Sequence, residues 1–243
     1  MSIIGGTFLT GMKHTLLLHK KALWVAVLLI VFLVLLASFY LYSLTIPSSL
    51  LSTLPSVTKT KNGQTGDPIT VALVGDKSKL LTAFNKAHWL IPDPINEATT
   101  IKIIKTSITN SPYPTAPVSN LYLFGRIQDL AFEYPTNTVR KRHHIRIWKA
   151  DKLVSGQQVW VGAASFDSGL ELSGTTHFPT HHIDPNVDAE RNFLMQSLQH
   201  TGFIKNAQLQ RITFPVMFGH NGNGDWYFDD GNAEIVTLKS ILK

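Results

Sequence analysis

The pattern of hydrophobic and polar positions divides the chain into three parts. Residues 22–42 form an apolar run without a charge, which as a helix is long enough to cross the ~30 Å hydrocarbon core of a bilayer. Residues 43–67 are rich in Ser, Thr, Pro and Gly, a composition typical of linkers. From residue 68 onward, short apolar runs alternate with turn residues. We therefore expect one transmembrane helix, a flexible tether and one globular domain at 68–243.

Basic residues beside the apolar run predict its orientation. Lys13, Lys20 and Lys21 precede it, and the first basic residue after it is Lys59. The positive-inside rule then makes residues 1–21 cytoplasmic and places the globular domain in the periplasm or outside the cell. A cleaved signal peptide is the alternative, but its apolar region spans only ~7–15 residues. We therefore expect a single-pass membrane protein.

The longest alternating pattern predicts an antiparallel hairpin. Residues 139–150 place Arg142, His144 and Arg146 on one face, while the positions between them carry His143 and isoleucines. Residues 157–167 form a second β-rich run, joined to the first through a turn containing Ser-Gly. Further apolar runs at each end of the domain predict additional strands.

Helices are predicted between these strands. Residues 77–87 have apolar positions at helical spacing and follow Asp76, a good N-cap. A second helix begins at Asp184, with Pro185 at its first position, and ends near Gly202. Residues 97–108 fit a helix or a strand equally well. Mixed hairpins and separated helices predict an α+β domain.

Composition excludes several classes of protein. The chain has 243 residues and no cysteine, so disulfides, thiolate metal sites and a Cys nucleophile are impossible. Its net charge is +6, but Lys13, Lys20 and Lys21 account for three of the 22 basic residues. The remaining 19 face 16 acidic residues without a basic tract. We therefore expect no nucleic-acid partner.

Several sequence blocks, in a fixed order, resemble the LssY C-terminal domain family. They are VALVGDKSKLLTAFNKAHW, APVSNLYLFGRIQDLAFE, RKRHHIRIW, VWVGAASFD, THHIDPNVDAERNFL and GDWYFDDG. The resemblance covers residue 68 to the C-terminus and implies membrane association, because members often carry this domain behind membrane segments. In the last block the family usually has Thr where this chain has Asp229. The resemblance leaves the reaction open.

The block THHIDPNVDAER contains a candidate metal site. In an extended segment His182 and Asp184 point the same way, and in the following helix Asp184, Asp188 and Arg191 share one side. Two carboxylates and an imidazole suit Zn, Mn or Fe. An ordinary helix start explains the same acids, since Asp184 can cap the helix and the negative charge of Asp188 interacts favourably with the helix dipole.

The hairpin contains a candidate anion-binding site. Arg142 and Arg146 flank His144 on one strand face, and arginines bind phosphate well. Buried arginines need acidic partners, for which Asp184, Asp188 and Glu190 of the helix start are the most obvious supply. Three further acids are alternatives: Asp129, Glu133 and Asp167. We expect one pocket lined by His144, His182, Asp184 and Asp188. Three arginines should lie within reach of it: Arg142, Arg146 and Arg191. A structural ion-pair network, or a solvated edge strand, explains the same residues.

Two functions therefore remain open. The first is a metal-assisted hydrolase of phosphoesters or other anionic substrates at the membrane surface, with His144, Asp188 and Arg191 as catalytic residues. A divalent metal would then be the cofactor, held by His182, Asp184 and Asp188. The second is a non-catalytic envelope module that binds an anionic ligand or a partner protein through the basic hairpin.

Overall fold

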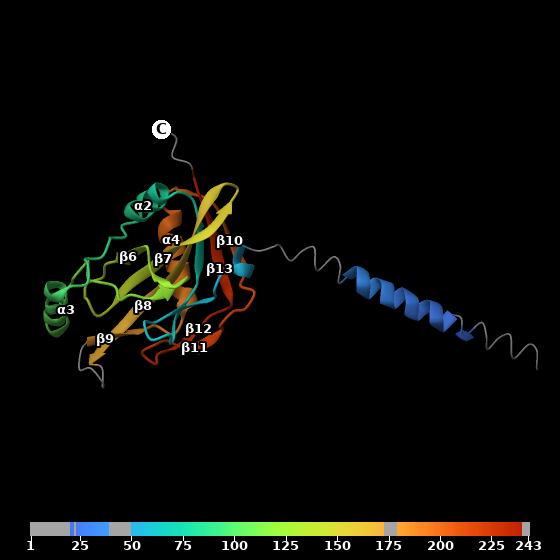
Figure 1. Cartoon of the computed structure of the whole chain (residues 1–243), viewed down its shortest axis with the longest axis horizontal. Helices are drawn as coiled ribbons and strands as arrows, with labels where there is room; N and C mark the ends of the chain where they lie inside the picture. Colours follow the sequence, from blue (N-terminus) through green and yellow to red (C-terminus); the bar gives the residue numbers. More distant parts are fainter. Residues whose placement is uncertain (1–19, 22, 39–49, 173–178, 240–243) are drawn as a thin grey trace, which may run out of the picture. The chain divides into compact units, whose positions relative to one another are not determined.

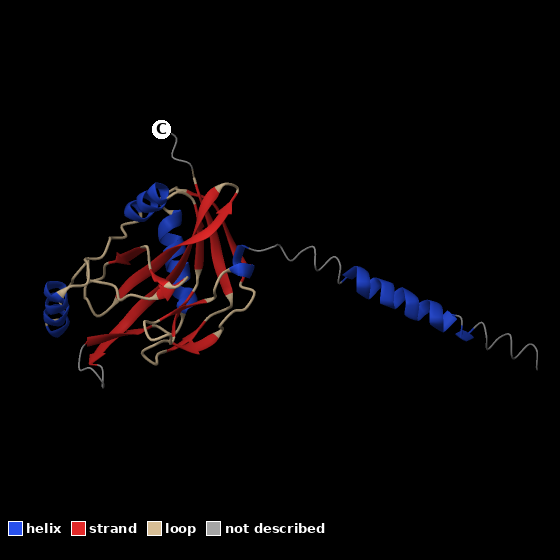
Figure 2. Cartoon of the chain, viewed as in Figure 1, coloured by secondary structure: helices blue, strands red, loops and turns tan. Residues whose placement is uncertain are grey.

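The computed structural model describes residues 20, 21, 23–38, 50–172 and 179–239. Two compact units make up the chain, the first from Met1 to Ser49 and the second from Leu50 to Lys243. In the first unit, residues 23–38 are helical, with apolar, exposed side chains. The second unit contains the strands that the structure describes (Figures 1 and 2).

The predicted transmembrane helix at 22–42 is not supported. Among the described residues, no helix is both long and apolar enough to cross a membrane. The rest of the predicted span, residues 22 and 39–42, lies outside the described part of the chain.

A seven-stranded sheet forms the centre of the second unit. Its path is β10-β13-β3-β8-β7-β6, and β9 also pairs with β8. The β3–β13 pair is parallel, and the other pairs are antiparallel. The strands are β3 (Val71–Val74), β6 (Leu130–Tyr134), β7 (Arg142–Val154), β8 (Gln157–Leu172), β9 (Pro179–Ile183), β10 (Ile204–Arg211) and β13 (Asn232–Leu238).

The β7–β8 hairpin confirms the strand pattern of the sequence. Its register pairs Arg142 with Asp167 and His144 with Ser165. Ser155 and Gly156 form the turn, both with positive φ (50° and 75°), as a two-residue turn matched to the twist of a hairpin requires. The period of two then sends Arg142, His144 and Arg146 to one face of the sheet.

The two faces of this sheet have different coverings. On one face, Ile145 and Ile147 pack with Phe84 of α2 (Lys77–Lys86) and Leu194 of α4 (Val187–Gln199). On the other face, Trp148 packs with residues that include Leu121 and Leu123. Leu123 belongs to a four-stranded sheet of order β2-β1-β4-β5, which thus packs on this second face. Its strands are β1 (Val57–Lys59), β2 (Thr65–Pro68), β4 (Tyr122–Leu123) and β5 (Arg126–Ile127).

Two peripheral elements border the second face. Helix α3 (Glu97–Ile108) begins with a capping box between Asn96 and Thr99, which settles the ambiguity of this segment in favour of a helix. It lies at the margin of the unit, away from α2 and α4 (Figure 1). A separate hairpin consists of β11 (Phe218–His220) and β12 (Trp226–Phe228).

The predicted tether at 43–67 differs from the structure. Residues 43–49 lie outside the described residues, but Leu50–Thr53 form a short 3-10 helix, η1, and β1 and β2 follow. Leu51 is buried against Ala72 and Ala233, and this packing orders a segment whose composition resembles a linker. The folded unit therefore begins at Leu50. Its mixed α+β character, with antiparallel hairpins and separate helices, agrees with the sequence.

Candidate functional site

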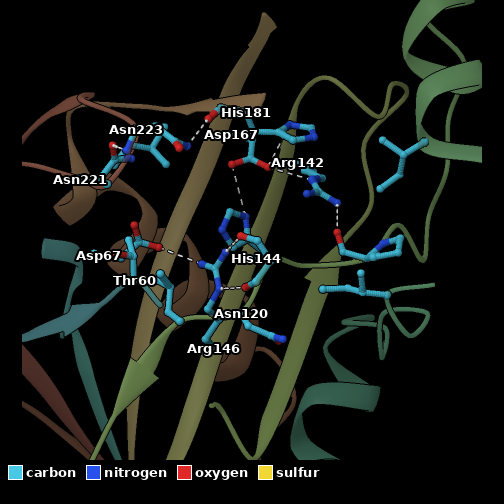
Figure 3. A pocket seen from close by; sticks show the side chains of 18 of the residues that line it. Thr60, Asp67, Asn120, Arg142, His144, Arg146, Asp167, His181, Asn221 and Asn223 are labelled. Carbon is cyan, nitrogen blue, oxygen red and sulfur yellow. Dashed lines mark hydrogen bonds and ion pairs between the residues drawn. The ribbon is translucent and has the colours of Figure 1, made fainter. Parts of the chain in front are cut away.

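A cavity of about 460 Å³ opens on the second face of the large sheet. Its floor consists of polar side chains from β7, β8 and β9, joined by Asp67 of β2 (Figure 3). Isoleucines on and beside α3 line one wall, and the 221–223 loop lines another. The polar floor residues are Asp67, Arg142, His144, Arg146, Asp167 and His181.

Arg142 lies in a buried network of acceptors. Its Nε donates to Asp167 Oδ2 (2.8 Å), and its Nη1 donates to Glu133 Oε2 (3.3 Å) and to the carbonyls of Ala116 and Pro117. Within the described residues, its Nη2 makes no hydrogen bond. The guanidinium is therefore held rigidly, with one nitrogen left over for a ligand.

Arg146 is fixed in a similar way four residues further along β7. Its Nη1 donates to Asp67 Oδ2 at 2.8 Å, while its Nε and Nη2 bind the carbonyl and hydroxyl of Ser119. Ser165 is fully buried and donates its hydroxyl proton to the same Asp67 oxygen, at 2.7 Å. The Ser165 hydroxyl does not line the cavity, which agrees with the absence of a nucleophile motif around it.

Two imidazoles face the carboxylate of Asp167. His181 Nδ1 lies 3.2 Å from Oδ2, and His144 Nδ1 lies 3.7 Å from Oδ1. Neither contact has hydrogen-bond geometry, so His144 Nδ1 and both ring nitrogens of His181 are buried and unbonded. Figure 3 shows Asp167 between Arg142 and the two imidazoles. Unbonded buried nitrogens are costly in a folded protein and mark a place where a ligand can bond.

Burial controls the protonation of these groups. It lowers the pKa of His181 to about 4 and that of His144 well below its usual value. Burial alone would raise the pKa of Asp167, but His144, His181 and Arg142 together outweigh it and lower that pKa to about 2. At neutral pH both imidazoles are therefore uncharged, and Arg142 is the permanent cation beside the Asp167 carboxylate.

Burial also neutralises a third acid of the network. It raises the pKa of Glu133 to about 8, although Arg142 acts in the opposite direction. At pH 7 the two arginines are therefore offset by Asp67 and Asp167. The cavity floor carries little net charge but many fixed hydrogen-bonding groups.

Hydrogen bonds of Asp225 hold the 221–223 loop beside the cavity. Asp225 accepts hydrogen bonds from the Ile183 backbone N–H and from Asn221 Nδ2, and it pairs with the His182 ring. Gly222 fits closely against Thr60, because a Cβ at this glycine would lie 2.3 Å from the Thr60 Cγ2. Neighbouring residues of a strand point to opposite sides, so His181 lines the cavity and His182 does not. His182 instead pairs with Asp225.

The structure brings together only part of the predicted site. Arg142, His144 and Arg146 line one cavity, as the alternation along the strand predicts. The four residues expected beside them do not line it: His182, Asp184, Asp188 and Arg191. The expected shared pocket does not form, because α4 packs on the isoleucine face of β7, opposite the arginines.

The start of α4 is a structural cap with its own ion pairs. Asn186, not Asp184, is the N-cap, and its side chain accepts from the Ala189 N–H. Asp184 instead accepts from the Asn186 N–H at 2.8 Å, in a turn before the helix. Arg191 pairs with Asp188 (3.0 Å) and with a second acid, Asp230, from the turn before β13.

The predicted metal ligands do not assemble either. In the described ranges, the one group of three or more potential ligands close enough to hold an ion is Asp188, Asp229 and Asp230. Arg191 already pairs with two of these acids and supplies the positive charge that they need. The set of His182, Asp184 and Asp188 is therefore not a preformed site, because His182 pairs with Asp225 and Asp184 closes its own turn.

The sequence offered signals for some of the residues that were missed. Asp167 and Glu133 were already alternative partners for the arginines, and both bind Arg142. Strand alternation places His181 and His182 on opposite faces, and the residue predicted to face the site is His182. Asp67 had no local signal, since it reaches Arg146 from 79 residues away in the sequence.

Comparison with known proteins identifies the family. A family model described as LssY C-terminus matches residues 51–233, about three quarters of the chain. This match confirms the resemblance found in the sequence blocks and extends it to the start of the folded unit. No match was found among curated proteins or among solved structures.

Proposed function

This chain belongs to the LssY C-terminus family, and we propose that its domain binds a small anionic ligand in the cavity above β7. The supporting observation is the arrangement of the floor: Arg142 and Arg146 are each immobilised by acids and carbonyls, and unbonded nitrogens remain around them. A ligand that binds here loses little to side-chain ordering, because the protein has already fixed its donors.

In this proposal the affinity for the ligand comes from hydrogen bonds and not from the net charge of the cavity. The buried acids offset the arginines, so the floor exerts little long-range pull. At short range, Arg142 Nη2 and an imidazole N–H of His181 are donors suited to phosphate or carboxylate oxygens. Each such charge-assisted bond is worth roughly 1.5–3 kcal/mol when buried.

Calorimetric titration of the full chain with ethyl phosphate, a minimal phosphate monoester, tests the proposal. We expect binding that weakens at least tenfold in Arg142→Gln and stays unchanged in Arg191→Gln, a control arginine outside the cavity. His181→Gln is a milder second variant, because it keeps the Arg142 ion pairs intact. The proposal fails if the wild-type chain shows no binding, or if the cavity variants and Arg191→Gln behave alike.

Hydrolysis of the bound ligand is the second candidate function. It is favoured by the position of Asp167, whose carboxylate lies beside the rings of His144 and His181. Burial keeps both imidazoles uncharged at neutral pH. An imidazole oriented by a carboxylate has the geometry of a general base, although its lowered pKa makes it a weak one. The predicted metal-binding set does not contribute, since it lies outside the cavity.

Turnover separates binding from hydrolysis. The full chain is incubated with p-nitrophenyl phosphate at neutral pH, with and without added Zn²⁺ or Mn²⁺. Hydrolysis that His181→Gln abolishes, while ethyl phosphate still binds, supports an enzyme. Binding without release of nitrophenol supports a binding module.

A further inference from the structure

One side of the cavity is apolar, in contrast to its floor. Ile103 and Ile104 of α3 line it together with Thr100, at the i, i+3 and i+4 spacing of one helix face. Ile95, just before the helix, adds to this wall and is 55% exposed. Neither Ile95 nor Ile104 belongs to a hydrophobic core cluster of the described residues.

Helix α3 also has few buried residues. Ser107 is the only buried residue described along its length. Ile101 and Ile108 face solvent, with exposed fractions of 58% and 74%. An amphipathic surface helix normally buries its apolar stripe in the protein core. Here part of that stripe borders an open cavity, which indicates that something apolar covers it when the site is occupied.

We propose that the natural ligand is amphiphilic: an anionic head group on the polar floor and a hydrocarbon portion along the α3 wall. This inference rests on the proposed function, because it assigns the head group to the same floor. The cavity volume of about 460 Å³ exceeds what a phosphate alone needs and accommodates a chain of several carbons. Ile103, Ile104 and Ile95 then determine specificity for the chain, and the arginines anchor the head.

The size of the expected effect follows from hydrophobic transfer. A methylene group moved from water to an apolar wall gains about 0.8 kcal/mol at most, which is about a fourfold gain in affinity. Hexyl phosphate differs from ethyl phosphate by four methylenes and carries the same charge. Because the cavity is partly open, we expect a smaller total gain than full burial gives, of about tenfold or more.

The test compares these two phosphate monoesters on the full chain by calorimetry. Hexyl phosphate is expected to bind at least tenfold more tightly than ethyl phosphate. In Ile104→Ser this preference should fall to threefold or less, because the hexyl ester loses more affinity than the ethyl ester does. Ile104→Val is a milder version, and Ile101→Ser is the matched control on the solvent face of α3.

Each outcome separates this inference from the proposed function. Equal affinity for both esters overturns the amphiphilic ligand and leaves anion binding standing. A preference for the hexyl ester that survives in Ile104→Ser also overturns it, because the chain then lies elsewhere. If neither ester binds, the proposed function fails and takes this inference with it.

Discussion

Two regions of this domain combine arginines with acids, yet they differ in what they leave open. At the start of α4, Arg191 fills the space between Asp188 and Asp230, and the pairs satisfy one another. On the floor of the cavity, Arg142 and Arg146 are buried to a similar degree and equally well paired, but among the described residues unbonded nitrogens of Arg142, His144 and His181 remain in the lining. The comparison teaches that ion pairs alone do not mark a site; unmet hydrogen-bonding capacity next to a cavity does.

The largest expected contrast between the two regions is in stability. Asp167→Ala leaves Arg142 with a weakened set of partners inside the protein, and we expect a loss of roughly 3–5 kcal/mol in the free energy of unfolding. Asp188→Ala leaves the buried Arg191 bonded to both oxygens of the part-exposed Asp230, so the expected loss is only about 1 kcal/mol. Urea unfolding of the two variants measures both values. Equal losses would remove the distinction between the regions.

The two regions should also respond to acid in opposite directions. Burial lowers the pKa of His181 to about 4, so between pH 6.5 and 4 the unfolded chain binds a proton that the folded chain does not. Stability from this group therefore falls as the pH drops through that window, by up to about 3 kcal/mol. Burial raises the pKa of Asp229 to about 6, so in the folded chain this acid binds its proton first. Its contribution to stability therefore rises as the pH drops from 6 to 4.

Variants isolate these opposite effects. His181→Gln should lose less stability than the wild-type chain between pH 6.5 and pH 4.5, since it removes the histidine that resists protonation. Asp229→Asn should lose more over the same range, because it removes a group that gains stability on protonation. Unfolding free energies from urea titrations at the two pH values provide the measurement. Shifts of the same sign in both variants would contradict the assigned burial effects.

These outcomes bear on what the sequence alone could predict. Local periodicity correctly predicted the β7–β8 hairpin and the shared face of Arg142, His144 and Arg146, because alternation is a property of the strand itself. It also predicted the helix that follows, but began it at Asp184 and Pro185, whereas α4 begins at Val187. Which face of the sheet that helix covers depends on long-range packing with α2, and no local pattern contains that information.

Asp67 and the 50–67 segment show the same limit. Asp67 completes the Arg146 pair from a strand that the composition places in a linker. Its role depends on the burial of Leu51 and on a pairing of β1 with β4 across more than 60 residues of sequence. Sequence blocks identified the family, and the structure was needed to show which of their charged residues meet.

A smaller effect is expected at the loop beside the cavity. In Gly222→Ala the new methyl group collides with Thr60, which should shift the loop, cost roughly 1–2 kcal/mol and weaken ethyl phosphate binding by a few fold. Gly169→Ala is the matched control, because its Cβ would meet no atom within 4 Å. Thermal unfolding and calorimetry compare the two variants. A Gly222→Ala chain that behaves like Gly169→Ala would show that the loop does not shape the site.

The central claim, that the cavity and not the start of α4 binds an anion, is tested most directly by NMR of arginine side chains. The full chain, labelled with ¹⁵N-arginine, is titrated with ethyl phosphate while the Nε–H signals of Arg142 and Arg191 are followed. The account predicts that the Arg142 signal shifts in a saturable manner and that the Arg191 signal stays in place. A saturable shift of Arg191, with Arg142 unchanged, would contradict it.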